Sequence, residues 1–186
     1  GAAHLYPCDS IEIYVGGLPV EREWPYEYKA GFAPSDVIEE YTRPARLVEH
    51  GKIVVREALT EPELMHFSGI GTLEGFNTFG LRWLATTLPV PFMKEKTLRY
   101  PGHIELMRVF RETGFFDKSE IDVKGVRVRP LDVTSKLLFP KWTHDPGEDE
   151  FTVMRVTVKG ESCLTYDLYD EYDPQANTTS MARTTA

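Results

Sequence analysis

The sequence has 186 residues, of which 41% are hydrophobic and 27% charged, and this composition is typical of one soluble globular domain. Acidic residues outnumber basic ones by 29 to 21, so the surface would repel phosphate groups and we expect no nucleic-acid partner. No apolar run approaches the roughly 20 residues of a membrane-spanning helix, and no secretory signal is visible, so we expect a cytoplasmic protein without a membrane partner.

The cysteines and histidines show no spacing typical of a metal site, so we expect no metal cofactor. Cys8 and Cys163 lie near opposite ends of the chain. We interpret them as two reduced thiols, as is usual in the cytosol, with a disulfide between the two ends as the alternative.

The N-terminal part of the chain predicts one strand and one helix. Alternating apolar residues predict a strand over Ile11–Val15, which ends in a turn at Gly16–Pro19. A capping pattern at Ser35 or Asp36 then predicts a short helix that ends at Pro44.

The next segment predicts a hairpin, a single helical turn and a further strand. The hairpin pairs Arg46–Glu49 with Lys52–Glu57 around the turn residues His50–Gly51. A second capping pattern at Thr60–Glu63 predicts one turn of helix, and Leu73–Phe76 predicts a strand.

The middle of the chain predicts two helices with an extended segment between them. Gly80–Thr87 is expected to be helical, and Met93–Tyr100 is expected to be extended. His103–Thr113 has the clearest amphipathic pattern, and Gly114 occupies the position where a glycine commonly ends a helix.

The C-terminal part predicts a strand, a helix and a long hairpin before a polar tail. Val123–Arg129 is expected to be a strand and Val133–Phe139 a short helix. Phe151–Val158 and Cys163–Tyr172 predict the hairpin. We therefore expect residues 1–186 to form one α+β domain, with a mixed, mostly antiparallel sheet and helices packed on one of its faces.

Glycine-rich residues 69–75 are a weak candidate for a nucleotide-binding loop. The third glycine comes one position late, and no strand precedes the segment. The preferred interpretation is a glycine-rich turn that lets backbones approach closely.

The segment Glu95–His103 is the strongest candidate for chemistry. A charged strand leads through Pro-Gly into a helix, which brings Arg99, Tyr100 and His103 close together. The unpaired backbone N–H groups at the helix start would suit a carboxylate. The alternative is a charged edge strand followed by an ordinary helix start.

Together these segments resemble the second domain of the saccharopine dehydrogenase family, with greatest similarity to its lysine 6-dehydrogenase and bacterial saccharopine reductase branches. The matching blocks occur in the family's order and cover nearly the whole chain. They are Tyr14–Pro19, Tyr28–Lys29, Pro34–Ile38, Leu73–Thr78, Glu95–His103 and Ser180–Thr185.

The resemblance implies one half of a two-domain oxidoreductase that oxidises a carbon bearing nitrogen. In this family a Rossmann domain binds NAD or NADP, and the second domain binds the amino-acid substrate and forms a homodimer. The resemblance therefore implies that the Rossmann domain and a final helix are absent from residues 1–186, so that this piece alone should not bind the cofactor. The implied substrate is lysine or saccharopine, a small molecule of lysine metabolism.

The resemblance also implies roles for individual residues. His103 would be the catalytic base or contact the substrate amine, because imidazole titrates near neutral pH. Arg99 would bind a substrate carboxylate, with Tyr100 beside it. Further implied contacts are Asn77 and Thr78 with the amino-acid end of the substrate, and Arg183 and Thr184 near the cofactor.

Several alternatives stay open at this point. Arg99 would instead form an ion pair with Glu95, Asn77 would be a turn residue, and Arg183 would belong to a solvated tail. Phe79 stands where the family often has an acidic residue, which favours a second interpretation: a non-catalytic dimerisation module of the same fold.

Overall fold

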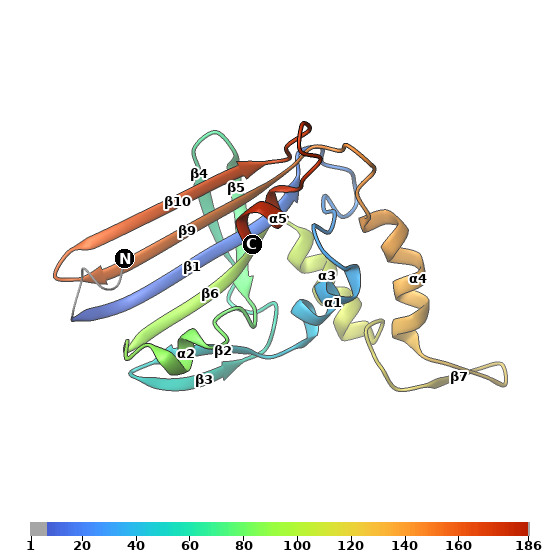
Figure 1. The fold of residues 1–186 in the computed structure, drawn as a ribbon. Coiled ribbons are helices and arrows are strands. Elements are labelled where there is room, and N and C mark those ends of the chain that lie inside the picture. The colour runs from blue at the N-terminus through green and yellow to red at the C-terminus, as the bar shows by residue number, and fades with distance from the viewer. Residues whose placement is uncertain (1–6, 186) are drawn as a thin grey trace.

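The computed structural model of the protein describes residues 7–185 and builds them around one mixed sheet (Figure 1). The sheet has eight strands: β1 (Cys8–Pro19), β2 (Ala45–Glu49), β3 (Lys52–Arg56), β4 (Glu63–Phe67), β5 (Gly71–Asn77), β6 (Phe92–Arg99), β9 (Glu150–Gly160) and β10 (Cys163–Glu171). Their order is β10-β9-β1-β6-β2-β3. Strand β5 pairs with β4 and with the C-terminal half of β6, whereas β2 pairs with β6 near its N-terminal end. Among the paired strands of residues 7–185, only β1 and β6 run parallel. The predicted α+β fold with a mostly antiparallel sheet is confirmed.

Helices and one small hairpin complete the described fold. They are α1 (Pro34–Thr42), α2 (Leu84–Thr87), α3 (His103–Thr113), α4 (Pro130–Trp142), α5 (Ser180–Thr185), and β7 (Ile121–Val123) with β8 (Val126–Val128). In Figure 1, α1, α3 and α4 lie together at one end of the sheet, and the β7–β8 hairpin projects away from them.

Separate apolar cores form on the two faces of β6. The helix-side core contains Val37, Tyr41, Phe76, Met107 and Trp142. The other contains Tyr14, Leu18, Leu73, Leu98 and Phe151. Successive residues of a strand point to opposite faces, so Leu98 packs in the second core while its neighbours Thr97 and Arg99 face the helices.

Local patterns predicted several elements correctly. Helix α3 spans the predicted residues, and it is flanked by Gly102 and Gly114, which have left-handed φ values of 96° and 89°. The β2–β3 and β9–β10 hairpins also pair as expected. Cys8 is buried and Cys163 exposed, and both are free thiols.

Gly16–Pro19 forms the last part of β1 rather than the predicted turn, because pairing with β9 continues as far as Pro19. Close packing explains the first glycine: a Cβ on Gly16 would lie 2.6 Å from the carbonyl oxygen of Leu98. Pairing between distant segments therefore overrides the local turn signal.

The predicted short helix before Pro44 is confirmed as α1, but its predicted cap at Ser35 or Asp36 is not, and the second capping pattern starts no helix. Helix α1 begins at Pro34, and Ala33 before it makes no side-chain capping bond. Proline suits this position because it has no N–H group to leave unpaired. The predicted turn of helix at Thr60–Glu63 is replaced by a strand start, since Glu63 begins β4 and pairs with Gly75.

Three further segments differ in extent from the prediction. Helix α2 has only four residues, and Arg82 before it has a left-handed φ of 39° that interrupts the predicted helix. Helix α4 is longer than the predicted Val133–Phe139 at both ends. Val123–Arg129 is not one strand, because positive φ values at Lys124 and Gly125 make the turn of the β7–β8 hairpin.

We expect Gly16→Ala to lower the free energy of unfolding by about 1–3 kcal/mol, the usual effect of adding a methyl group to a tightly packed interior. The new Cβ would press on the Leu98 backbone between β1 and β6. Gly75→Ala is the matched control, because a Cβ there would meet its nearest atoms at an ordinary 3.5 Å. Urea denaturation measures both variants, and equal midpoints would contradict the packing argument.

Candidate functional site

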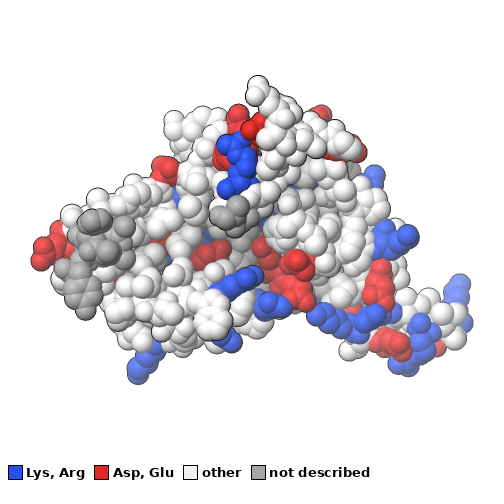
Figure 2. Space-filling view, in the orientation of Figure 1, with Lys and Arg blue, Asp and Glu red and all other residues white. Residues whose placement is uncertain are grey.

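A cavity of about 690 Å³ lies where α1 meets the sheet. Strands β1 and β6 form its floor, and α1 and the loop after β5 form walls. Figure 2 shows acidic and basic side chains gathered next to each other in the region where α1 meets the sheet. The lining includes seven charged residues: Asp36, Glu39, Glu40, Arg43, Arg82, Glu95 and Arg99. The volume and the converging polar groups suit a small polar ligand.

Strand β6 places its charged residues on two different faces. Glu95, Thr97 and Arg99 alternate along the strand and all line the cavity. Lys94 and Lys96 alternate with them and point to the opposite face. All except Lys94 are buried.

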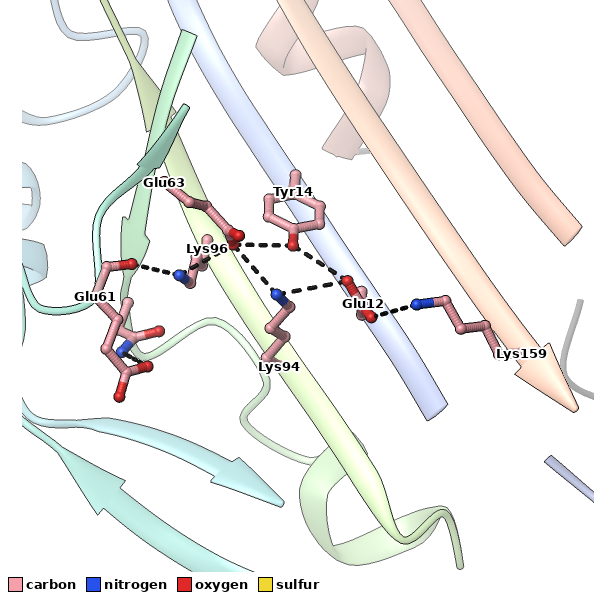
Figure 3. Close-up of polar contacts among 8 residues, drawn as sticks. Glu12, Tyr14, Glu61, Glu63, Lys94, Lys96 and Lys159 are labelled. Atoms are coloured by element: carbon pink, nitrogen blue, oxygen red, sulfur yellow. Dashed lines mark hydrogen bonds and ion pairs between the residues drawn. The ribbon is translucent and has the colours of Figure 1, made fainter. Parts of the chain in front are cut away.

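Figure 3 shows how the charges of the opposite face are compensated. Lys94 lies 3.5 Å from Glu12 and 3.2 Å from Glu63, and Lys96 lies 3.0 Å from Glu63. The hydroxyl of Tyr14 lies 2.9 Å from the Glu63 carboxylate. The lysine charges are therefore neutralised outside the cavity, and they do not pair with the charged residues that line it.

Arg99 is the most constrained charge of the cavity, with 2% of its surface exposed. Four of its five N–H groups have partners: the hydroxyls of Tyr28 and Tyr41, the carbonyl of Leu98 and the carboxylate of Glu40. Its guanidinium also lies 4.3 Å from the ring centre of Tyr28. Among the described residues, the second N–H group of Nη1 has no hydrogen-bond partner.

The ion-pair partner of Arg99 is Glu40, and not Glu95 as the alternative interpretation had it. The Glu40 carboxylate lies 3.0 Å from Nη2 of Arg99, and 28% of its side chain is exposed. Burial raises the pKa of Glu40, and the positive charge of Arg99 opposes that rise.

Glu95 is a buried carboxyl group that lines the cavity, and 5% of its surface is exposed. Thr78 donates a hydrogen bond of 2.6 Å to its Oε2, and the backbone N–H of Gly80 donates one of 2.9 Å to the same oxygen. Burial raises the pKa of Glu95 to about 7, the charge of Glu40 adds to the rise, and the Thr78 hydrogen bond opposes it. A carboxyl group of this kind can exchange a proton near neutral pH.

Gly80 makes the approach to Glu95 possible. A Cβ at this position would lie 2.2 Å from the carboxyl carbon of Glu95, so any side chain would displace the carboxylate. The predicted substrate contact Thr78 lies on the same loop, lines the cavity and also bonds to Thr97 at 2.9 Å.

His103 lies behind the cavity wall and not on its lining. Its Nδ1 donates to the carbonyl of Tyr26 at 2.8 Å, so its Nε2 accepts from the hydroxyl of Tyr41 at 2.9 Å. Burial and the nearby charge of Arg99 lower the pKa of His103 to about 3. The ring is therefore neutral and both nitrogens are engaged, which favours a supporting role over the expected one of base.

Two other predicted substrate contacts belong to the opposite face of the sheet, since Asn77 pairs with Lys96 and Tyr100 packs in the core that contains Leu98. The hydroxyl of Tyr100 donates to the carbonyl of Pro19 at 2.9 Å. Asn77 is fully buried and donates to Glu61 at 2.9 Å, while its Oδ1 has no partner among the described residues. Neither residue lines the cavity.

The predicted cofactor-proximal residues lie on α5, which is a helix rather than a solvated tail. Arg183 forms ion pairs with Asp170 at 3.3 Å and Asp173 at 3.4 Å. Thr184 donates back to the Ser180 carbonyl within the helix. Their neighbour Met181 lines the cavity instead.

Phe79, the departure from the family pattern, lines the cavity next to several arginines. The guanidinium groups of Arg43 and Arg46 lie 5.5 Å and 5.1 Å from its ring centre. Arg82 lines the same cavity and has no ion pair among the residues that the structure describes. Basic side chains thus surround a ring where an acidic residue was expected.

Among the cavity residues that sequence reasoning did not assign to the site, Glu95 and Glu40 matter most for its chemistry. A signal existed for Glu95, because strand periodicity puts it on the same face as Arg99. Glu40 gave no such signal, since its proximity to Arg99 depends on how α1 docks on the sheet.

The glycine-rich residues 69–75 do not form a phosphate cradle for a dinucleotide. Gly69 and Gly71 have left-handed φ values of 80° and 106° and join the antiparallel strands β4 and β5, as the turn interpretation predicted. A phosphate cradle would instead need a turn between a strand and a helix. Within residues 7–185 no group of three or more histidine, cysteine or acidic side chains is arranged to hold a metal ion, and none of the helices there could cross a membrane.

Comparisons with known proteins agree with this architecture. A family model described as "Saccharopine dehydrogenase C-terminal domain" matches residues 3–186. The fold is similar to that of apo histidine-tagged saccharopine dehydrogenase (L-Glu forming) from Saccharomyces cerevisiae, with a TM-score of 0.71 and 15% sequence identity. That match covers 95% of this chain and 56% of the yeast chain, so this chain spans little more than half of the yeast protein. The chain therefore belongs to the saccharopine dehydrogenase family, to whose C-terminal domain it corresponds.

Proposed function

We propose that this domain binds the amino-acid substrate of an NAD(P)-dependent enzyme that oxidises a carbon–nitrogen bond, with lysine or saccharopine as the substrate. Its membership of an oxidoreductase family supports the reaction class. The observation that carries the proposal is Arg99, a buried guanidinium on a cavity wall with one N–H group left for a ligand. A substrate carboxylate would form a charge-assisted hydrogen bond there.

Glu40 supports this role because its carboxylate already makes the contact that a substrate carboxylate would make. Leaving a buried guanidinium unpaired is costly, so an internal carboxylate stabilises the free domain. A substrate carboxylate would join Glu40 at this guanidinium, on the N–H group of Nη1 that has no partner among the described residues.

The remaining predicted residues have supporting roles in this proposal. Thr78 lines the cavity and donates to Glu95, so a substrate would meet the acceptor side of its hydroxyl. Asn77 and Tyr100 support the sheet from its opposite face, and their contact with the substrate stays a prediction. The ion pairs of Arg183 with Asp170 and Asp173 fix the outer side of α5. The proximity of Arg183 and Thr184 to the cofactor stays a prediction.

The nicotinamide of NAD or NADP accepts a hydride in this class of reaction. Because residues 69–75 form a turn between two strands and not a phosphate cradle, the roles proposed for the described residues are confined to the substrate. The cofactor would be bound by another part of the protein.

A non-catalytic module of the same fold is the second candidate, and Phe79 is the observation that favours it. Against it stands the chemistry of the cavity. Charged groups are rarely buried beside an open cavity unless they act there, and this cavity has both a buried guanidinium and a buried carboxyl group with a raised pKa.

We expect Arg99→Lys to raise KM for a carboxylate-bearing substrate about 10- to 100-fold, because one charge-assisted hydrogen bond contributes about 1.5–3 kcal/mol. Nicotinamide absorbance would be followed with the native full-length protein and lysine or saccharopine. 1,5-Diaminopentane, which lacks the carboxylate, should be affected far less. Arg155→Lys, on the exposed Arg155–Asp167 pair, is the matched control. A uniform loss with both types of substrate would contradict the carboxylate contact.

We propose that His103 is a positioning residue that orients Tyr41, and stability measurements can test this without activity. A histidine held neutral in the fold is protonated in the unfolded chain, so stability falls as pH drops from about 6.5 towards the folded pKa of about 3. Relative to His103→Gln, the wild type should lose about 2 kcal/mol of unfolding free energy between pH 7.5 and pH 5.

The difference between variant and wild type isolates His103 from other groups, notably Glu95, whose raised pKa acts in the opposite direction. His66→Gln, an exposed position on β4, is the control. A constant difference between wild type and His103→Gln across this pH range would show that the ring is not held neutral.

We also propose a homodimer that pairs through the edge strand β10. This nine-residue strand pairs with β9 on one side, and on its other side no strand of the described residues covers its backbone groups. Tyr166 and Tyr169 on it are each about half exposed. Sedimentation velocity should show a dimer that Tyr169→Lys weakens by repulsion across the two-fold axis; a monomer at every concentration would contradict the proposal.

A further inference from the structure

We propose that Glu95 is the residue that accepts a proton from the ammonium nitrogen of the substrate. This inference rests on the proposed function, since it concerns the same cavity, and it assigns to Glu95 the base role expected of His103, which does not line the cavity. Glu95 is the cavity group with the right chemistry: a carboxyl group that reaches the ligand space from the strand that also bears Arg99.

The hydrogen bonds of Glu95 leave one oxygen for a ligand. Thr78 and the Gly80 N–H both donate to Oε2. The Thr97 hydroxyl, on the same strand, is a further hydrogen-bond neighbour of this carboxyl group. Oε1 accepts neither the Thr78 nor the Gly80 bond, and it is not among the buried polar atoms that lack a partner. Oε2 is thus the anchored oxygen, and Oε1 is the one that a substrate nitrogen would meet.

The charged surroundings favour a cationic group at this oxygen. Glu40 and Asp36 from α1 add negative charge to the same cavity, and Glu39 lies at its edge. The positive groups of the lining are Arg43, Arg82 and Arg99, of which Arg43 is paired with Glu39 and Arg99 with Glu40. Among the described residues, Glu95 and Asp36 are left with Arg82 as the unpaired charges of the lining. An amino acid therefore finds carboxylates for its ammonium group and guanidinium groups for its carboxylate in one cavity.

The proton transfer balances without any further reactant. An N–H bond of the ammonium breaks, its electron pair stays on nitrogen, and an O–H bond forms at Oε1. The products are a neutral amine and a neutral carboxylic acid, a pair that a buried site tolerates better than two separated charges. The neutral amine is the form from which the neighbouring carbon can release a hydride. A group with a pKa near 7 returns the proton to water readily at physiological pH.

The experiment uses n-butylammonium, a cation without a carboxylate, and the 186-residue chain labelled with carbon-13 at the glutamate carboxyls. Because the cation binds only the ionised form, its affinity should rise about tenfold from pH 6 to pH 8. Saturating amine should also lower the titration midpoint of the Glu95 carboxyl. Glu95→Gln should remove the pH dependence and most of the binding, and Glu161→Gln, an exposed turn residue, should change neither.

Thr78→Val provides a second variant that keeps the carboxyl group. Removing the hydrogen bond that lowers the Glu95 pKa should move the midpoint of amine binding to higher pH. This shift is expected even if Glu95→Gln fails to fold.

The outcomes separate this inference from the proposed function. Amine binding that is absent, independent of pH, or unchanged in Glu95→Gln would overturn the inference. Binding of n-hexanoate reports the Arg99 end of the cavity, and it should survive Glu95→Gln. If the wild type binds n-butylammonium with the expected pH dependence but does not bind n-hexanoate, the proposed function is contradicted and the role of Glu95 stands.

Discussion

The burial of one guanidinium organises the candidate site. Arg99 is 2% exposed, and an ion of this kind is tolerated only when its charge and its N–H groups are satisfied. Its partners come from three separate segments, namely Tyr28, helix α1 with Glu40 and Tyr41, and the backbone of β6. Satisfying Arg99 therefore fixes α1 against the sheet, and the cavity is the space that this docking encloses. The site and the helix-side core depend on the same contact.

Strand alternation allows β6 to bear opposite charges close together without mixing them. The lysines of the strand pair with carboxylates on the far face, including Glu63, and the acidic group of Glu95 faces the cavity. If Lys94 or Lys96 pointed into the cavity, its charge would lower the pKa of Glu95 and remove its ability to exchange a proton near neutral pH. The separation of faces is thus a condition for the proposed chemistry as well as for folding.

The sequence predicts well those elements in which local preference and tertiary pairing agree, such as α3 with its flanking glycines. It fails where distant segments decide, as at Gly16–Pro19, which has turn residues but is paired along β9. The same distinction holds in the site. Arg99 and Thr78 could be predicted because they belong to recognisable blocks, whereas Glu40 depends on helix docking. His103 was recognised as important, and its role could be judged only from the partners of its two ring nitrogens.

Segments from opposite ends of the chain, β1 and α5, meet at the cavity. A Cβ on Gly17 would lie 2.6 Å from the terminal methyl group of Met181, so this glycine makes room for the side chain that α5 inserts beside the cavity. Helix α5 is held there by the buried carboxylate of Glu150, which accepts from both the backbone and the hydroxyl of Ser180 at 2.6 Å. A buried charge satisfied by a helix start fixes that helix in one orientation. Gly17 of β1 and Met181 of α5 therefore depend on each other. Because Gly17 has no side chain, the Met181 side chain can pack against β1 and line the cavity.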